Sequence, residues 1–431
     1  MLPLRSLLAH GLSIVVVVLC AGISLAAEPA ASAKPRAAAV NDFKSTHFLV
    51  HTDLPAKEAQ ELLEKLETMI ALVSRYWGRP CAGVIECYVA RDLANWPAGS
   101  LDPGGRAKIA AGAGVTRTDV LMLGNKTVAA KSVVYATSER GTAQHEAVHA
   151  YCGQTFGTTG PLWYAEGMAE LAQYRLPSGG VGCHAVMADY LRKAPRRTAA
   201  QVASEAGTTG DGWRNYAWRW ALCHMLAYNS NYSSRFRTFG RGLLDGQPRK
   251  FGEEFAAVAD QLEFEYRFFV ERVRSGYRVD LCRWDWKRSF SPLSPGATLD
   301  CKVLARRGWQ PTGMLVEAGS RYEVSTAGQW RTAAHLPQVS ADGGRKGRGR
   351  LIGVILSDYQ LSKPFLIGGH GTFAAPTSGK LYVRCQDAWN ELADNNGTMQ
   401  VRLRRSPRKP QMNADGRRWS TTKATVLNSH R

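Results

Sequence analysis

The sequence predicts an α+β fold followed by an all-β sandwich, and three observations lead to this expectation. Strand-like apolar runs occur near the start of the chain, and helical patterns dominate from there to about residue 275. Short strand-like runs separated by Gly, Asp and Asn then follow beyond residue 300. A small sheet followed by helices is typical of an α+β domain, and evenly spaced short strands are typical of a sandwich.

Length and composition indicate an ordinary globular protein with a basic surface. The 431 residues suffice for two or three domains, and 45% hydrophobic with 21% charged residues excludes a largely disordered or collagen-like chain. The 55 Lys and Arg residues exceed the 36 Asp and Glu residues by 19, which favours anionic partners such as envelope polymers. No recognisable nucleic-acid-reading module accompanies this charge, so we expect no nucleic-acid partner.

Residues 1–27 have the pattern of a cleavable export signal. Arg5 precedes a mostly apolar run from Leu12 to Leu19, and small residues lead to a cleavage site at Ala27. A membrane anchor is the alternative, although the run is short for a bilayer span. No later segment approaches about 18 uninterrupted apolar residues, so we expect no transmembrane segment after signal removal and a secreted, periplasmic or cell-envelope protein.

The cysteine count leaves two interpretations open. Eight cysteines remain after the signal, and an even number in an exported chain suggests disulfides whose pairing the spacing does not reveal. Several buried free thiols are the alternative. None of the cysteines forms a CxxC pair, which argues against a cysteine zinc site or a thioredoxin-like centre.

The α+β domain is expected over residues 42–280, after an Ala/Pro-rich leader at 28–41. Apolar residues at helical spacing predict a helix over 56–77. We expect the strands of the sheet at 47–51, 84–90, 120–123 and 133–135.

The all-β sandwich is expected over residues 301–405. Pro292, Ser294, Pro295 and Gly296 indicate a linker at 281–300. We expect strands of the sandwich at 321–325, 351–356, 365–367, 380–385 and 399–403. Residues 406–431 are polar and basic without apolar periodicity, which predicts a disordered tail. Attachment to anionic envelope polymers and a merely solvated tail both fit this composition.

The strongest chemical signal is His145-Glu146-Ala147-Val148-His149. Residues i and i+4 share one face of a helix, so His145 and His149 can present both imidazoles to one metal ion. Glu146 stands beside them, where it can take a proton from a metal-bound water. Such a pentapeptide also arises by chance, so its value depends on a third ligand elsewhere in the chain.

A second helical motif, residues 163–170, lies shortly downstream. It places Glu166 and Glu170 on one face of a helix. Glu166 is the natural third metal ligand. Glu170 can hydrogen-bond a ligand histidine and fix its tautomer. Cys152 and Thr155 stand where a metzincin has Gly and the third His, so that pattern is absent.

These two motifs make residues 42–275 resemble the gluzincin metallopeptidases, specifically the peptidase-MA-like domains of exported bacterial proteins. The resemblance implies that His145, His149 and Glu166 bind zinc and that Glu146 is the general base. Gluzincins commonly supply an oxyanion donor from a later helix. Tyr216 is the candidate here, with His224 behind it, and an aromatic helix that simply packs in the core is the alternative.

The β region carries an independent signal in residues 387–397, where acidic and amide oxygens gather after a strand. Calcium takes six to eight hard oxygen ligands, so this composition suits it, although the EF-hand pattern is missing. A structural sandwich with an Asx-rich turn and no ion is the alternative.

Residues 316–404 resemble the calcium-dependent galactose-binding bacterial lectins. The matching features are Ala327-Gly328, residues 373–376, and Asp387 with the run 394–397. The resemblance implies calcium ligands at Asp387, Asp394 and Asn395, with the Glu391 carbonyl as a further ligand. The lectin pattern has Asn where Asp394 stands, and the sugar-facing loop is not recognisable in residues 343–350. We therefore expect calcium but not galactose.

Two functions fit these observations. The first is an exported zinc metallopeptidase that hydrolyses a peptide or protein substrate and is held near a glycan or envelope surface by the sandwich. The second is a non-catalytic glycan- or envelope-binding adhesion protein whose metal site is inert or structural. The intact Glu146 favours the first, because a structural zinc site does not need that carboxylate.

Overall fold

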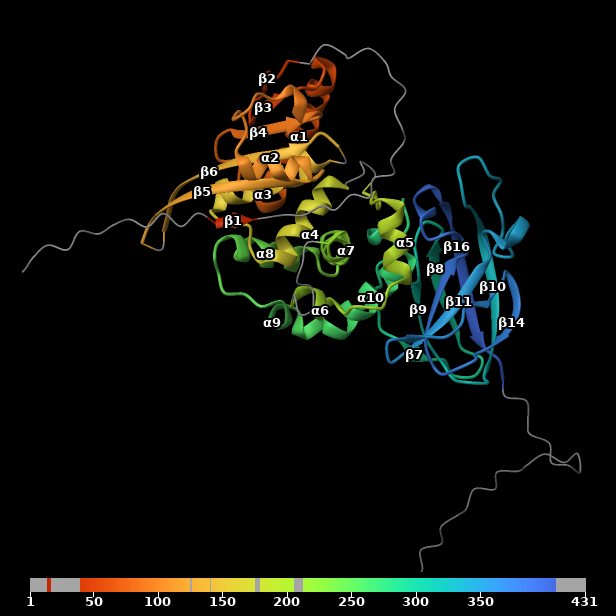
Figure 1. The fold of residues 1–431 in the computed structure, drawn as a ribbon. Coiled ribbons are helices and arrows are strands. Elements are labelled where there is room, and N and C mark those ends of the chain that lie inside the picture. Colours follow the sequence, from red (N-terminus) through yellow and green to blue (C-terminus); the bar gives the residue numbers. More distant parts are fainter. Residues whose placement is uncertain are drawn as a thin grey trace, which may run out of the picture. The chain divides into compact units, whose positions relative to one another are not determined.

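The computed structural model describes residues 14–16, 39–124, 126–139, 141–174, 179–204 and 212–407 (Figure 1). The chain is of the mixed α+β class, as predicted, and divides into two compact units at residues 283 and 284. Most of the expected signal and leader, and nearly all of the expected tail, lie outside the described residues. Within the described ranges no helix combines the length and apolar character needed to cross a membrane.

The first unit contains one mixed sheet of order β1-β5-β6-β4-β3-β2. Its strands are β1 (Ile14–Val16), β2 (Asn41–Lys44), β3 (Phe48–Thr52), β4 (Ile85–Ala90), β5 (Gly114–Leu123) and β6 (Lys126–Thr137). β3, β4 and β6 are parallel neighbours, and β5 returns antiparallel to β6. In Figure 1 the β5–β6 hairpin projects beyond the other strands. The four predicted strands overlap β3, β4, β5 and β6.

Helices of the first unit cover this sheet and continue beyond it. They are α1 (Ala56–Trp77), η1 (Leu93–Asn95), α2 (Pro103–Ala110), α3 (Thr142–Phe156), α4 (Leu162–Gln173), α5 (Ala185–Lys193), α6 (Ala199–Ala203), α7 (Trp213–Tyr228), α8 (Ser233–Leu244), α9 (Phe251–Phe255), η2 (Ala256–Val258), α10 (Ala259–Arg272) and α11 (Val279–Cys282). Helix α1 has the predicted bounds, and its apolar face is buried. It ends at Gly78, whose left-handed φ of 69° lets its N–H donate to Ser74 O.

Two glycines bring the central helices unusually close to their neighbours. A Cβ at Gly153 of α3 would lie 2.4 Å from Thr118 Oγ1, so α3 sits directly on β5. A Cβ at Gly167 of α4 would lie 2.4 Å from Cys223 Sγ and 2.7 Å from Arg219 O of α7. Helix α4 is thus held between α3 and α7, and this packing fixes which of its residues face α3.

The second unit consists of two sheets that share one core. Their orders are β14-β10-β16-β8 and β12-β11-β15-β9-β7, with β13 paired to β11. The elements are β7 (Ser291–Pro292), β8 (Thr298–Leu304), β9 (Gln310–Val316), β10 (Arg321–Arg331), η3 (Arg345–Gly347), β11 (Leu351–Ser357), β12 (Gln360–Leu361), β13 (Phe365–Leu366), β14 (His370–Ala374), β15 (Gly379–Cys385), η4 (Leu392–Asp394) and β16 (Asn396–Arg405). Side chains from both sheets, among them Val324 and Val383, form the core between them. The five predicted strands overlap β10, β11, β13, β15 and β16.

The range 281–300, expected as a linker, is structured. Trp284 is buried and its ring packs 4.5 Å from the ring of Tyr382. β7 pairs with β9, and β8 begins at Thr298. The Pro and Gly residues of this range make the turn that leads into β8. The division between the two units, between Arg283 and Trp284, lies near the start of the same range.

All eight cysteines in the described part of the chain are free thiols, and six of them are buried. Cys87, Cys152 and Cys223, for example, lie on β4, α3 and α7 with less than 5% of their surface exposed. The disulfides that the even count suggested are therefore not found, and the alternative of buried free thiols describes the structure. These thiols pack as small apolar side chains.

Candidate metal centre

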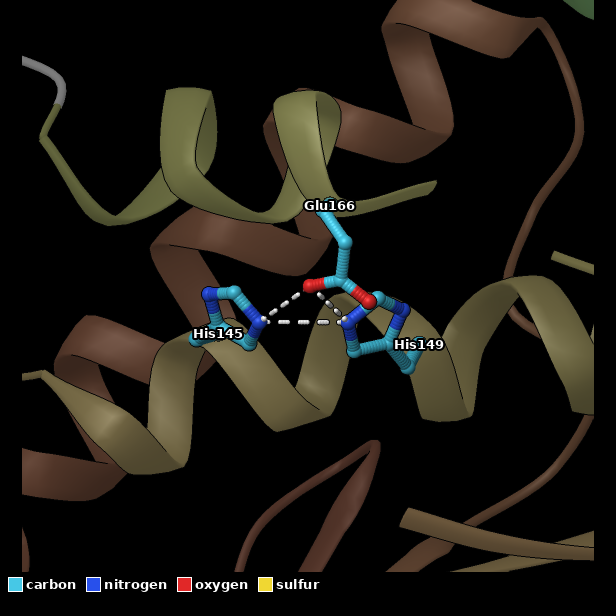
Figure 2. Close-up of side chains that lie close together, drawn as sticks. All are labelled: His145, His149 and Glu166. Carbon is cyan, nitrogen blue, oxygen red and sulfur yellow. Dashed lines mark hydrogen bonds and ion pairs between the residues drawn. The ribbon is translucent and has the colours of Figure 1, made fainter. Parts of the chain in front are cut away.

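Helix α3 presents His145 and His149 on one face, one turn apart, with their Nε2 atoms 3.2 Å from each other (Figure 2). Both side chains are buried, at 2% and 1% exposure. The helix begins at Thr142 after Gly141 and ends at Gly157, two glycines in the left-handed region. Small residues such as Ala147 and Ala150 let it lie among its neighbours, so the imidazoles sit in the interior.

Helix α4 supplies the third side chain of this cluster, Glu166, which is fully buried. Its Oε2 lies 3.2 Å from His145 Nε2 and 3.5 Å from His149 Nε2 (Figure 2). Ligands of a tetrahedral zinc ion, at about 2.0–2.1 Å from the metal, lie about 3.3 Å apart. The three atoms therefore have the separation that one zinc ion requires. Within the described residues this is the one cluster of His, Cys, Asp and Glu with metal-ligand spacing.

The electrostatics of the cluster fit a cation. Burial acts to raise the pKa of Glu166, but the charges and hydrogen bonds of His149 and His145 outweigh it and hold that pKa well below its ordinary value. Glu166 is therefore ionised. Its Oε1 is buried and has no hydrogen-bond partner among the described residues. A buried ionised carboxylate with an unsatisfied oxygen is costly unless a cation neutralises it.

Glu170, one turn further along α4, lies behind His145. Its Oε1 is 3.2 Å from His145 Nδ1, on the ring edge opposite the Nε2 that faces Glu166. Burial acts to lower the pKa of His145, but hydrogen bonds to Glu166 and Glu170 raise it well above 6.5. A carboxylate at Nδ1 keeps a proton on that nitrogen, so the nitrogen that would give up its proton to bind a metal ion is Nε2.

Glu146 is buried beside the histidines and is held by β5. Its Oε2 lies 2.9 Å from the Thr116 hydroxyl, which is also 2.7 Å from the Glu146 main-chain oxygen. Burial raises the pKa of the Glu146 carboxyl, while the charges of His145 and His149 act in the opposite direction. A carboxylate with a raised pKa is better suited to accept a proton.

A close approach of β5 to α3 makes this arrangement possible. A Cβ at Gly114 would lie 2.6 Å from Glu146 Cγ and 2.7 Å from Thr142 Cγ2. Neither Gly114 nor Thr116 was singled out from the sequence. They belong to no motif, and only the pairing of β5 with β6 brings them to a helix about 30 residues further along the chain.

The two proposed oxyanion donors lie in different surroundings. The ring of Tyr216 is 6.0 Å from the ring of His145 and meets it edge-on, so Tyr216 borders the cluster and its role stays a prediction. The ring of His224 stacks on Phe269 and touches Trp220 and Tyr228. Burial lowers the pKa of His224 to about 3. It is therefore a neutral ring within an aromatic cluster.

The residues expected to bind calcium lie at one end of the second unit. The side chain of Asp387 is 1% exposed, and its Oδ1 accepts from Arg348 Nη2 at 2.9 Å. Arg348 also pairs with Glu391. Asn395 is buried and donates from Nδ2 to Ala305 O at 3.2 Å, and Asp394 is exposed.

Two oxygens of this group are buried without a hydrogen-bond partner in the described ranges, Asp387 Oδ2 and Asn395 Oδ1. A cavity of about 380 Å³ lies beside Asp387, and it is lined by Lys346, Arg348, Gln386, Asp387, Ala388 and Glu391. Arg348 belongs to the loop at residues 343–350, which does not match the lectin pattern. Its guanidinium forms ion pairs with Asp387 and Glu391. No sequence motif pointed to this contact.

Two of the solved structures that align with this chain do so at low identity and low TM-score. A structure titled "EclA N-terminal domain; PllA-like lectin" aligns with 25% of this chain and 96% of its own length, at 21% identity and a TM-score of 0.22. A structure of IMPa from Pseudomonas aeruginosa, in complex with an O-glycopeptide, aligns with 56% of this chain and 26% of its own, at 13% identity and a TM-score of 0.17.

No family model matches the sequence, and no curated protein matches it. At their TM-scores, the two structural alignments assign the chain to no family. The function is therefore inferred from the geometry of the site.

Proposed function

We propose that the first unit is a zinc-dependent peptidase of the gluzincin kind, in which His145, His149 and Glu166 hold the metal. The observation that carries this proposal is the close cluster of three buried ligand atoms, 3.2–3.5 Å apart, with the carboxylate of Glu146 buried beside it. A structural zinc site usually has four protein ligands, whereas a catalytic site has three and leaves one position for water or substrate.

The roles of the residues follow from their contacts. A bound zinc ion supplies Lewis acidity and lowers the pKa of a water to about 7. Glu146 takes the proton of the attacking water and delivers it to the leaving amine, as general base and then general acid. Thr116 holds the Glu146 carboxylate in place. Glu170 holds the His145 ring so that Nε2 faces the metal.

The edge of the sheet beside Glu146 offers a place for an extended peptide. β1 pairs antiparallel with β5, with Ile14 opposite Thr118 and Val16 opposite Thr116. β1 belongs to the predicted signal, and cleavage of that signal would leave this edge of β5 open. An extended substrate can add to the same edge through main-chain hydrogen bonds. Such a strand would pass Thr116, which contacts the general base.

The test is hydrolysis of a mixed peptide library by the mature chain and by its Glu146→Gln variant. We expect cleavage by the first and a loss of about 10²–10⁴-fold in the second, because general-base catalysis contributes that much. Glu253→Gln, an exposed carboxylate on α9, is a matched control that should cleave normally. Equal cleavage by both variants would remove Glu146 from the mechanism.

The alternative function is adhesion to a glycan or to an envelope polymer, and one observation favours a binding role for the second unit. Asp387 Oδ2 and Asn395 Oδ1 are buried and lack hydrogen-bond partners in the described ranges. Buried oxygens without partners are expected where a cation binds. We propose that this lectin-like sandwich binds calcium there and holds an exported enzyme near its substrate.

Calcium binding can be tested on the purified chain by thermal unfolding with and without Ca²⁺. We expect Ca²⁺ to raise the unfolding temperature of the second unit, and the Asp387→Asn variant to lose this effect. Asp358→Asn, remote from this loop along the chain, is the control. An unfolding temperature that does not respond to Ca²⁺ would leave Arg348 as the sole cation partner of Asp387.

A further inference from the structure

The tip of the β5–β6 hairpin carries an unusual concentration of exposed apolar side chains. Leu121, Met122, Leu123 and Val128 are 61%, 47%, 77% and 58% exposed, and we call them the tip cluster. They account for four of the seven strongly exposed large hydrophobic residues in the described ranges. Scattered exposed hydrophobics are normal, but a contiguous group on one projecting element marks an interaction surface.

The hairpin connects this surface to the metal centre. β5 begins at Gly114, against Glu146, passes Thr116 and ends at Leu123 in the tip cluster. At about 3.3 Å per residue, the tip cluster lies about 17–23 Å along the strand from Thr116. The hairpin projects beyond the other strands in Figure 1, so its end is not covered by the rest of the sheet.

The direction of a strand on β5 is set by the pairing that the structure shows. β1 runs antiparallel to β5, so the residue opposite Thr118 precedes the residue opposite Thr116 in the chain. A peptide in the place of β1 would therefore extend its N-terminal part toward the tip cluster. Residues opposite Leu121 and Leu123 lie about five to seven positions before the residue opposite Thr116, by antiparallel register.

We infer that the tip cluster is a distal substrate-binding surface that takes apolar side chains several residues before the cleaved bond. This inference rests on the proposed peptidase function and deepens it, since it names a substrate class: extended segments with an apolar N-terminal part. A bulge between Leu121 and Met122 interrupts the ladder near the tip. Such a bulge turns an edge away from uncontrolled strand addition. Recognition at the tip therefore depends on side chains more than on backbone pairing.

The experiment measures peptide binding separately from cleavage. The full mature chain carries Glu146→Gln to prevent turnover, and two fluorescein-labelled peptide pools are titrated by anisotropy. Both pools have the same mixed C-terminal half, and their N-terminal halves are drawn from Leu, Ile, Val and Ala or from Ser, Thr, Gln and Asn. We expect the apolar pool to bind tighter, by about tenfold.

Variants of the tip cluster test whether its side chains cause the preference for the apolar pool. Leu121→Ser with Leu123→Ser should abolish the tenfold preference and leave binding of the polar pool unchanged. Val128→Ser, on the neighbouring strand, gives an independent reduction if the double variant does not fold. Val186→Ser is the matched control, because Val186 is 56% exposed but lies on α5. It should bind both pools like the parent.

Equal binding of both pools by the parent would overturn the inference, and so would a preference that survives in the tip variants. The tip variants are also tested for co-sedimentation with phosphatidylcholine–phosphatidylglycerol vesicles and for self-association. If they lose vesicle binding but bind peptides as the parent does, the surface binds a membrane and the inference is contradicted. If they lose only self-association, the surface binds a second copy of the chain and the inference is likewise contradicted. Cleavage by the chain with intact Glu146 is measured in parallel. Tip-dependent binding without cleavage would overturn the proposed function and leave the tip cluster as a peptide-binding surface. Cleavage without tip dependence would overturn this inference alone.

Discussion

The Thr116 hydroxyl lies within hydrogen-bond distance of two oxygens of Glu146, 2.7 Å from the main-chain oxygen and 2.9 Å from Oε2. This contact ties β5 to the second residue of the His145–His149 motif. One residue of β5 thereby sets where the proposed general base lies relative to the two histidines.

Replacing Thr116 with Val should impair catalysis without removing the metal. A hydrogen bond to a charged group is worth about 1.5–3 kcal/mol, so we expect kcat to fall by about ten- to a hundredfold. Thr116→Ser keeps the hydroxyl and should restore most of the rate. The measurement is the kcat of the parent and of both variants, with the zinc content of each preparation determined in parallel. A Val variant as fast as the parent would refute the role of Thr116.

Replacing Gly114 with Ala should destabilise the first unit. The added Cβ would lie 2.6 Å from Glu146 Cγ, so α3 or β5 must shift, and overpacking of this kind costs about 1–3 kcal/mol. Gly252→Ala is the control, because no atom lies within 4 Å of its Cβ. Denaturant unfolding of both variants gives the comparison. Equal free energies of unfolding for the Gly114→Ala and Gly252→Ala variants would show that β5 and Glu146 are not in close contact at Gly114.

Replacing Glu170 with Gln should weaken zinc binding. The carboxylate 3.2 Å from His145 Nδ1 fixes the ring, and loss of such a partner typically costs 10–100-fold in metal affinity. Competition with a chromophoric chelator measures the affinity. The exposed Glu253→Gln change is the matched control and should leave it unaltered. An affinity that does not change on Glu170→Gln would mean that His145 is oriented by packing alone.

The buried His224 should make stability depend on pH. Burial lowers its pKa to about 3, while the charge of Asp280 acts weakly the other way. The unfolded chain binds a proton at this residue below about pH 6.5 and the folded chain does not, so stability is lost as pH falls from 6.5 toward 3. The loss is about 1.4 kcal/mol per pH unit over that range.

The His224→Phe variant lacks this titration and should retain the ring contacts with Phe269 and Trp220. Between pH 6.5 and 5.0 its free energy of unfolding should fall by about 2 kcal/mol less than that of the parent. Denaturant unfolding at the two pH values measures the difference. Identical pH dependence in both chains would show that His224 is protonated in the folded state.

The elements that the sequence predicted best are those with strong local patterns. Helix α1 has the predicted bounds because seven apolar residues recur at helical spacing along it. The helices with His145 and Glu166 follow from motifs whose side chains must share one face. By contrast β14, with Phe373 as its buried residue, has no apolar alternation and was not predicted. The Pro and Gly residues at 292–296 make a turn inside the second unit, and the division between the units lies earlier in the expected range, between Arg283 and Trp284, because the same residue types serve turns and linkers.

The parts of the site that the sequence did not reveal depend on tertiary contacts. Gly114 and Thr116 touch Glu146 only because β5 folds back beside α3, and Arg348 reaches Asp387 across about 40 residues. Whether cysteines form disulfides likewise depends on positions in space, and none of the eight cysteines in the described ranges forms one. Local periodicity carries no information about such contacts.

The most direct test of the metal centre is the zinc content of the purified chain, measured by inductively coupled plasma mass spectrometry after equilibration with zinc and desalting. We predict one zinc per chain in the parent and in Glu146→Gln, and less than about a tenth of that in the His145→Ala, His149→Ala double variant, because removing two of three ligands leaves too few to retain the ion. A parent chain without zinc, or a double variant that retains it, would contradict the assignment of His145, His149 and Glu166 as the metal centre.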